Sequence, residues 1–205
     1  LRIHGVGNAK VKVHRPMEGA LKTIGVTRDG CGHWYAIATR EVATKPLPAS
    51  DAEVGIDVGI LTFAALSDGE MIANPRPLAT ARIALERAQR VVSRRKRNSK
   101  RRRKARRVLA GHHARVCNVR RDFHHQTARS IVRKYGRIAV EELNVKGLAG
   151  GMLAKHVNDA AWGQFVTILS EKAAETARTL VRVDPRGTSQ KCSECGEVVL
   201  KDLGV

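Results

Sequence analysis

Acidic residues stand inside two segments of this 205-residue sequence that otherwise have the apolar character of buried strands. Asp57 lies in the middle of the apolar segment 54–60, and Glu141 and Glu142 directly follow the apolar segment 138–140. Burying a carboxylate costs several kcal/mol unless it is paired or binds a cation. The alternative for Asp57 is a hydrogen bond to a neighbouring turn.

Two core strands that deliver carboxylates to one edge of a sheet have a definite chemical use. Mg²⁺ prefers one or two carboxylates, keeps several waters and shares a substrate phosphate. A pair of such ions stabilises both the attacking and the leaving oxygens of a phosphodiester displacement. The sequence therefore makes Asp57, Glu141 and Glu142 candidate metal-binding residues.

A basic segment from Arg87 to Arg107 contains 13 Lys and Arg residues and no acidic residue. The usual explanation of a charged run is a solvated helix face, but such a face normally carries Glu or Asp for i,i+4 pairs. Cations at helical spacing predict one ridge about 25 Å long: Arg87, Arg90, Arg94, Arg97, Arg101 and Lys104. Such a ridge fits a nucleic-acid backbone and supplies affinity rather than sequence readout. The predicted nucleic-acid-binding residues are Arg87, Arg90, Arg94, Arg95, Lys96, Arg97, Lys100, Arg101, Arg102, Arg103, Lys104, Arg106 and Arg107.

The four cysteines are too few for a disulfide scaffold. Cys192 and Cys195 have the C-x-x-C spacing of a metal knuckle, which supplies two of the four ligands of a structural Zn²⁺ site. Cys31 and Cys117 are remote from each other in the sequence and are interpreted as buried small side chains.

The charge of the whole chain indicates a polyanionic partner. Lys and Arg number 38 against 19 Asp and Glu, which gives a formal net charge of +19. A folded chain this basic repels itself unless a polyanion supplies negative charge, and nucleic acid is favoured over an acidic membrane or protein. The apolar fraction of 42% supports a folded core. No apolar run has the length of a membrane span, and neither a membrane nor a small-molecule substrate is expected as a partner.

Short strands are expected in the first 45 residues, around 11–13, 24–26 and 35–37, with a hairpin turn at 29–32. The segment 45–50 contains two prolines and is interpreted as a linker and domain boundary. Three strands joined by tight turns then predict an antiparallel meander: 54–60, 61–66 and 70–73.

The segment 78–135 has the periodicity of two amphipathic helices, with Gly111 as the expected break between them. The histidine pairs at 112–113 and 124–125 could be metal ligands, but surface positions near phosphates fit them better. A strand at 138–140 follows, then a helix capped by Asn158–Asp159 and a last strand at 179–184. The order predicts an α/β domain with a mixed sheet.

Three ordered motifs in these segments resemble the TnpB/OrfB proteins of insertion-sequence transposons, which are relatives of the type V CRISPR effector nucleases. The motifs are Gly55–Ile60, which contains Asp57, Val140–Gly147, which contains Glu141, and Val183–Gly196, which contains the C-x-x-C pair. The similarity also covers the basic helix pair.

The resemblance implies a RuvC-like RNase H fold, in which three carboxylates bind Mg²⁺ for DNA cleavage. Asp57 corresponds to the first carboxylate and Glu141 to the second. The implied domains are a wedge-like β-barrel fragment at 1–49, the nuclease domain at 50–184 with its basic helical pair at 78–135, and half a zinc ribbon at 185–205. The implied reaction is RNA-guided cleavage of DNA, with DNA and guide RNA as partners and a cytoplasmic, nucleoid-associated location.

The sequence departs from the family pattern after the C-x-x-C pair. Neither a second cysteine pair nor the motif with the third catalytic Asp follows, and Asp184 and Asp202 do not lie in the matching motif. The chain is therefore expected to be a truncated copy, active as an endonuclease when intact. The alternative is a catalytically inactive remnant that only binds RNA or DNA. A third interpretation, a basic RNA-binding domain, gives no use for buried acids.

Overall fold

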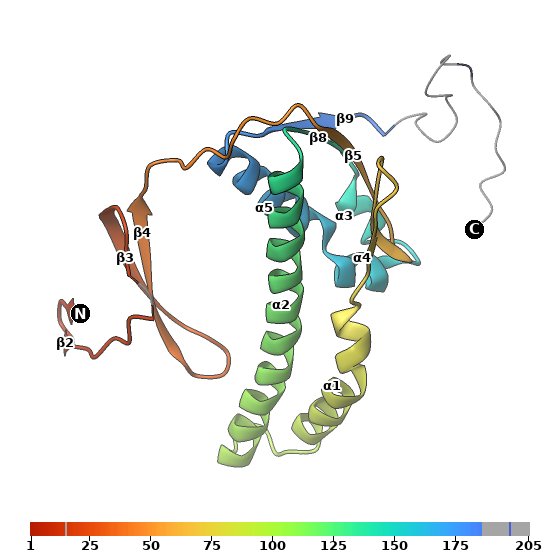
Figure 1. Cartoon of the computed structure of the whole chain (residues 1–205). Coiled ribbons are helices and arrows are strands. Elements are labelled where there is room, and N and C mark those ends of the chain that lie inside the picture. The colour runs from red at the N-terminus through yellow and green to blue at the C-terminus, as the bar shows by residue number, and fades with distance from the viewer. Residues whose placement is uncertain (15, 186–196, 198–205) are drawn as a thin grey trace. The chain divides into compact units, whose positions relative to one another are not determined.

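The computed structural model describes residues 1–14, 16–185 and 197, and the chain forms two compact units (Figure 1). The hairpin unit consists of Leu1–Lys45 and Ala81–Cys117. The sheet unit consists of Pro46–Thr80 and Asn118–Val205. The two units are described separately.

A five-stranded mixed sheet forms the centre of the sheet unit, with the strand order β7-β6-β5-β8-β9. Its strands are β5 (Glu53–Val58), β6 (Thr62–Leu66), β7 (Met71–Ala73), β8 (Arg137–Glu141) and β9 (Thr179–Val183). Strands β5, β6 and β7 pair antiparallel, whereas β8 lies parallel to both β5 and β9. The predicted meander and the predicted mixed sheet are both confirmed.

One face of this sheet is buried against helices. Val54 and Ile56 on β5 and Ile138 and Val140 on β8 are buried, as the period of two in a strand requires. They share a core with the C-terminal part of α2 (Lys100–Lys134) and with α5 (Trp162–Glu175), whose ribbons lie on the same side of the sheet in Figure 1. The intervening strand residues therefore face the opposite side.

Gly136 connects α2 to β8 at a point where the backbone is crowded. Its N–H donates to the carbonyl of Ala52, and its own carbonyl accepts from Thr179. A Cβ at this position would overlap the carbonyl oxygen of Ser50. Only glycine therefore lets the chain enter the centre of the sheet here.

Asn158 and Asp159 do not cap the following helix, so that prediction was wrong. They lie inside α4 (Ala154–Ala160), which follows the short α3 (Val145–Leu148), and α5 begins after the left-handed residue Ala161. The buried Asp159 carboxylate instead accepts hydrogen bonds from the backbone N–H groups of Leu78, at 2.9 Å, and Ala79, at 3.3 Å. It therefore caps the start of α1 (Pro77–Ser93) through a tertiary contact that sequence neighbours cannot reveal.

The hairpin unit contains a long antiparallel hairpin made by β3 (Ala20–Arg28) and β4 (Trp34–Glu41). Before it come the two short strands β1 (Arg2–Ile3) and β2 (Gly7–Asn8), and residues 11–13 form no strand, so the strand predicted there was wrong. Every residue of β3 is exposed. The hairpin is thus held mainly by its own backbone pairing.

The helical part of the hairpin unit turns at residues 94–99, between α1 and α2. The predicted break at Gly111 was wrong, because α2 runs through this residue without interruption. A glycine costs only about 1 kcal/mol in a helix interior. Asn98 is in the left-handed region, with φ of 62°, and the Ser99 hydroxyl accepts from the N–H of Arg102 at the start of α2.

Candidate functional site

Asp57 and Glu141 lie on neighbouring parallel strands at the centre of the sheet. The register places Ile56 opposite Val140, so the next positions along the two strands are Asp57 and Glu141. Both follow a buried residue and therefore project from the face opposite the core. The sheet brings together two carboxylates that are 84 residues apart in the sequence.

The electrostatics of this pair favour a bound cation. Desolvation raises the pKa of Asp57 above its usual value of 3.8, and the negative charge of Glu141 raises it further. A dication between the carboxylates removes this repulsion. The donor set of two carboxylate oxygens, with room for water, fits Mg²⁺, a hard cation that retains several waters.

Small side chains surround the acidic pair on its own face. Gly55 lies two positions before Asp57, and Ala139 lies two positions before Glu141. Residues two apart in a strand share a face, so Gly55 and Ala139 lie on the face of the two carboxylates. The neighbouring Val183 on β9 stands opposite Glu141 and is exposed. On β5 and β8, the strand neighbours of the two carboxylates on this face are therefore small, whereas the neighbour of Glu141 on β9 is a valine.

Glu142 and Asp184 directly follow the last residues of β8 and β9, which pair as Glu141 opposite Val183. The N–H of Glu142 donates to the carbonyl of Val183, at 2.9 Å. The carboxylate of Glu142 forms an exposed ion pair with Arg182, at 3.7 Å. Glu142 therefore lies one position beyond the strand residue Glu141, and its carboxylate pairs with an arginine.

The basic segment is divided over three elements, so the predicted single ridge was wrong. Arg87 and Arg90 lie on α1, residues 94–97 lie in the turn, and residues 100–107 lie on α2. Twelve of the 13 predicted residues are exposed, and Arg102 is half-buried. The folded segment is therefore a helical hairpin with cations on both arms and on its connecting turn.

Arg102 has a structural role in this turn. One of its guanidinium nitrogens donates to the carbonyls of Val92 and Arg95, both at 3.0 Å, at the C-terminal end of α1. The carbonyl of Val92 also accepts from the N–H of Arg95, at 3.3 Å, and a cation at a helix C-terminus is electrostatically favourable. Beside this clamp lies a cavity of about 740 Å³ whose lining includes Arg97, Arg103 and Arg106.

His124 is buried in the core and does not lie on the helix surface as predicted. It is fully buried on α2, its Nε2 lies 3.0 Å from the carbonyl oxygen of Ala160, and its ring stacks on Phe63 at a centroid distance of 5.4 Å. Desolvation lowers its pKa below 6.5, so the ring is neutral at pH 7. The spacing of His124 four and seven residues before the core residues Ala128 and Ile131 was the signal that it is buried.

The cysteines have different outcomes. Cys117 is exposed, so its interpretation as a buried side chain was wrong, and Cys31 is half-buried. Cys31 lies in one group with Asp29 and His33, which the sequence interpretation did not identify. Cys192 and Cys195, like Asp202, lie outside the described residues.

Within the described residues, the helices are too short or too polar to cross a membrane.

Comparison with known families gives two matches. Residues 34–151 match the family OrfB_IS605, which is described as "Probable transposase". Residues 162–203 match the Cas12f1-like TNB domain. The first match covers more than half of the chain and includes both Asp57 and Glu141.

Individual relatives have related names. A protein of Streptomyces pristinaespiralis named "Putative RNA-guided DNA endonuclease" is 40% identical over 192 residues, which are 92% of this chain and 48% of that protein. The Escherichia coli K12 protein named "Putative RNA-guided DNA endonuclease InsQ" is 27% identical over 93% of this chain and 52% of its own length. The chain thus spans about half the length of the relatives it matches.

The fold also resembles a solved structure, that of a Cas12f1–sgRNA–target DNA complex determined by cryo-EM. The TM-score is 0.58, with 16% sequence identity over 85% of this chain and 38% of that one. At this level of identity, the similarity establishes the fold alone.

Proposed function

Because the chain belongs to the OrfB_IS605 family of probable transposases, we propose that it supplies metal-binding carboxylates and nucleic-acid-binding helices to an RNA-guided DNA endonuclease of the TnpB type. The proposed substrate is DNA and the proposed partner is a guide RNA. In this proposal the five-stranded sheet is RuvC-like, with an RNase H fold, and Asp57 and Glu141 are its first two metal ligands.

The observation that carries this proposal is the alignment of Asp57 and Glu141 on parallel strands. The raised pKa of Asp57, caused first by desolvation and then by the negative charge of Glu141, supports this proposal. Mg²⁺, when bound, would stabilise the oxygens that attack and leave the phosphorus. The carboxylates hold the ion, and the small residues Gly55 and Ala139 leave space for a nucleic-acid backbone to approach.

The test compares isosteric variants of neighbouring acids. Asp57→Asn and Glu141→Gln should each abolish Mg²⁺-dependent DNA cleavage, measured on a plasmid substrate with the guide RNA, while nucleic-acid binding is retained. Glu142→Gln is the matched control, because Glu142 directly follows Glu141 and its carboxylate pairs with Arg182, and it should retain cleavage. Undiminished cleavage by Asp57→Asn would overturn the proposal.

The helical hairpin formed by α1 and α2 is proposed to bind the backbone of RNA or DNA. Its exposed cations and the arginine-lined cavity beside Arg102 support this role. Affinity should fall with salt, with a slope of about 0.9 per phosphate contacted in a duplex. Replacing Arg101, Arg103 and Lys104 together by Ala should reduce that slope, whereas Arg82→Ala, outside the basic segment, should leave it unchanged.

A second candidate function is nucleic-acid binding without cleavage. Within the described part of the chain, no third His, Cys, Asp or Glu joins Asp57 and Glu141 in a group with metal-ligand spacing. Family resemblance implies three carboxylates, and a site with only two of them would lack most phosphodiester chemistry. Salt-sensitive binding by this chain with no cleavage in Mg²⁺ or Mn²⁺ would favour this function over the first.

We also propose the domain plan of a wedge-like segment at 1–49, a nuclease segment at 50–184 and half a zinc ribbon at 185–205, in which Cys192 and Cys195 supply two of the four Zn²⁺ ligands. The match of residues 162–203 to the Cas12f1-like TNB domain supports the last of these. Association with the nucleoid would follow from DNA binding.

A further inference from the structure

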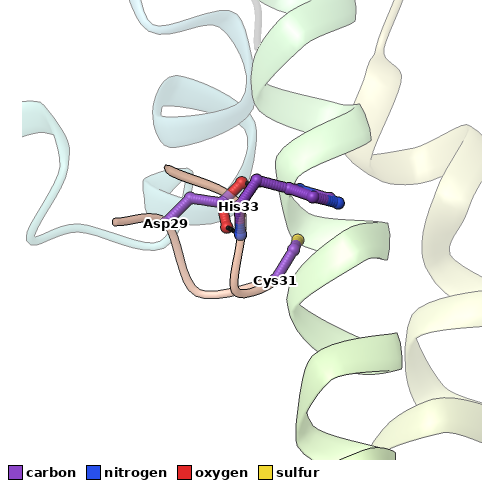
Figure 2. Close-up of side chains that lie close together, drawn as sticks. All are labelled: Asp29, Cys31 and His33. Atoms are coloured by element: carbon purple, nitrogen blue, oxygen red, sulfur yellow. Dashed lines mark hydrogen bonds and ion pairs between the residues drawn. The ribbon is translucent and has the colours of Figure 1, made fainter. Parts of the chain in front are cut away.

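The turn between β3 and β4 gathers three different metal-binding side chains. Asp29, Cys31 and His33 occupy alternate positions across the turn, and Figure 2 shows them together at the end of the hairpin. One potential ligand atom from each residue lies within 4.8 Å of the other two. This group is separate from the acidic pair on the sheet, and the proposed function makes no use of it.

The distances are close to those of a metal site. A carboxylate oxygen of Asp29, Oδ2, lies 3.2 Å from Nδ1 of His33. Tetrahedral Zn²⁺ with bonds of about 2.0–2.2 Å to N and O places two such ligands about 3.3 Å apart. The sulfur of Cys31 needs to approach by about an ångström at most, which a rotation of its side chain supplies.

The turn holds the Asp29 carboxylate in place through several hydrogen bonds. Its Oδ1 accepts from the backbone N–H of His33, at 2.8 Å, and its Oδ2 accepts from the hydroxyl of Tyr35, at 3.2 Å. The carboxylate is therefore already oriented, as supporting hydrogen bonds orient ligands in known metal sites.

Glycines on both sides of Cys31 shape the turn. Gly32 adopts a φ of +95°, a region that disfavours side chains, and its N–H donates to the carbonyl of Asp29 at 3.1 Å. This tight turn brings the side chains of Asp29, Cys31 and His33 toward one another. In an extended strand, the same residues would be spread along one face.

The charges around the group are compatible with a dication. The guanidinium groups of Arg28 and Arg107 lie beside Gly32. A carboxylate and a thiolate together carry two negative charges, which balance the two positive charges of a dication. The loaded site would therefore be neutral and would not be repelled by these two arginines.

We propose that Asp29, Cys31 and His33 form a binding site for Zn²⁺ or a similar borderline transition-metal dication. The mixed oxygen, sulfur and nitrogen donor set selects such a metal over Mg²⁺, which prefers oxygen ligands. The ion displaces the thiol proton to solvent and takes its fourth ligand from water. The bound ion stabilises the β3–β4 hairpin. Because no residue of β3 is buried, the hairpin would be only marginally stable without the ion.

The test is a Co²⁺ titration of the full chain in which Cys192 and Cys195 are both replaced by Ser, so that the second cysteine pair cannot contribute. One equivalent should give a cobalt–thiolate absorption band, and Zn²⁺ should displace it. Cys31→Ser should abolish the band, and His33→Asn should weaken Zn²⁺ binding by at least about a hundredfold. The matched control Cys117→Ser should leave both unchanged.

A further variant distinguishes a metal site that is held in place by hydrogen bonds from a cysteine that binds the metal by itself. Tyr35→Phe removes only the hydrogen bond to Asp29 and should weaken Zn²⁺ binding by about tenfold while the band is retained. Absence of a band in the parent, or a band that survives in Cys31→Ser, would overturn the proposal and leave the contact between Asp29 and His33 as a turn-stabilising hydrogen bond.

Discussion

The sheet unit and the hairpin unit differ in what holds their strands in place. In the sheet unit, strand residues such as Ile138 and Phe63 are almost completely buried. In the hairpin unit, apolar residues of β3 such as Ile24 and Val26 remain 43% and 46% exposed. Burial thus stabilises the first set of strands, whereas backbone pairing and local contacts hold the second.

This difference corresponds to the tasks proposed for the two units. Two carboxylates that share a metal ion must be fixed to within about half an ångström, which a packed sheet provides. Binding of a phosphate backbone by counterion release depends mainly on the number and density of cations. The basic side chains of α1 and α2 can therefore be exposed and conformationally free without loss of their proposed function.

The largest expected effect tests the difference in burial directly. Phe165→Ala removes a fully buried ring from the core of the sheet unit and should lower the free energy of unfolding by about 3–5 kcal/mol. Ile24→Ala on the exposed hairpin should change it by about 0.5 kcal/mol or less. Urea denaturation measures both. Similar losses in the two variants would show that the hairpin is buried in the folded protein in solution.

The next effect concerns the buried charge of Asp159. Its carboxylate forms an ion pair with Arg120 at 3.1 Å, and both side chains are largely buried, at 9% and 17% exposed. Asp159→Ala leaves a buried guanidinium without its partner and should cost about 3 kcal/mol. Asn158→Ala, one residue earlier and exposed, is the control. Equal stability of the two variants in thermal unfolding would contradict this assignment.

Adjacent arginines on α2 should separate stability from binding. Arg102→Gln removes the clamp on the last carbonyls of α1 and should cost about 1 kcal/mol, with faster amide exchange in the turn at 94–99. Arg103→Gln should leave stability unchanged and reduce the salt dependence of nucleic-acid binding. The assignment fails if Arg103→Gln destabilises the turn as much as Arg102→Gln does.

The smallest effect is a pH dependence from His124. Because burial lowers its pKa in the folded state, the unfolded chain binds the proton more readily. Its contribution to stability is complete above about pH 6.5 and is lost as the pH falls from there toward the folded pKa. His124→Phe should remove this slope from a series of unfolding measurements between neutral and mildly acidic pH. An unchanged slope would assign the pH dependence to other groups.

Much of the sheet could be predicted from the sequence because its determinants are local. Alternating apolar residues and tight turns predict β5, β6 and β7, and the apolar segment before Glu141 predicts β8. The same patterns predict the order of strands and helices, and this is why the positions of Asp57 and Glu141 could be anticipated. Their alignment depends on a register that only the structure provides.

The features that could not be predicted depend on tertiary contacts or on competition between weak local conformational preferences. Gly111 disfavours a helix, but the turn formed by Asn98 and Ser99 is the stronger signal because it combines a left-handed residue with a cap. The capping of α1 by Asp159 joins residues about 80 positions apart. The sequence shows that Asp29, Cys31 and His33 stand at alternate positions, but it does not give the conformation of the turn. That conformation brings the side chains of Asp29 and His33 into contact.

The parallel pairing of β5 with β8 has a consequence for how the protein is made. These central strands are separated in the sequence by β6, β7 and both long helices. The emerging chain must therefore hold β5 without its central neighbour until about residue 141 has left the ribosome, and long-range parallel pairing forms slowly. Synthesis that stops before β8 would yield an exposed strand edge prone to aggregation and no acidic pair. The proposed metal centre thus becomes available only after the synthesis of the basic helices that are proposed to bind nucleic acid.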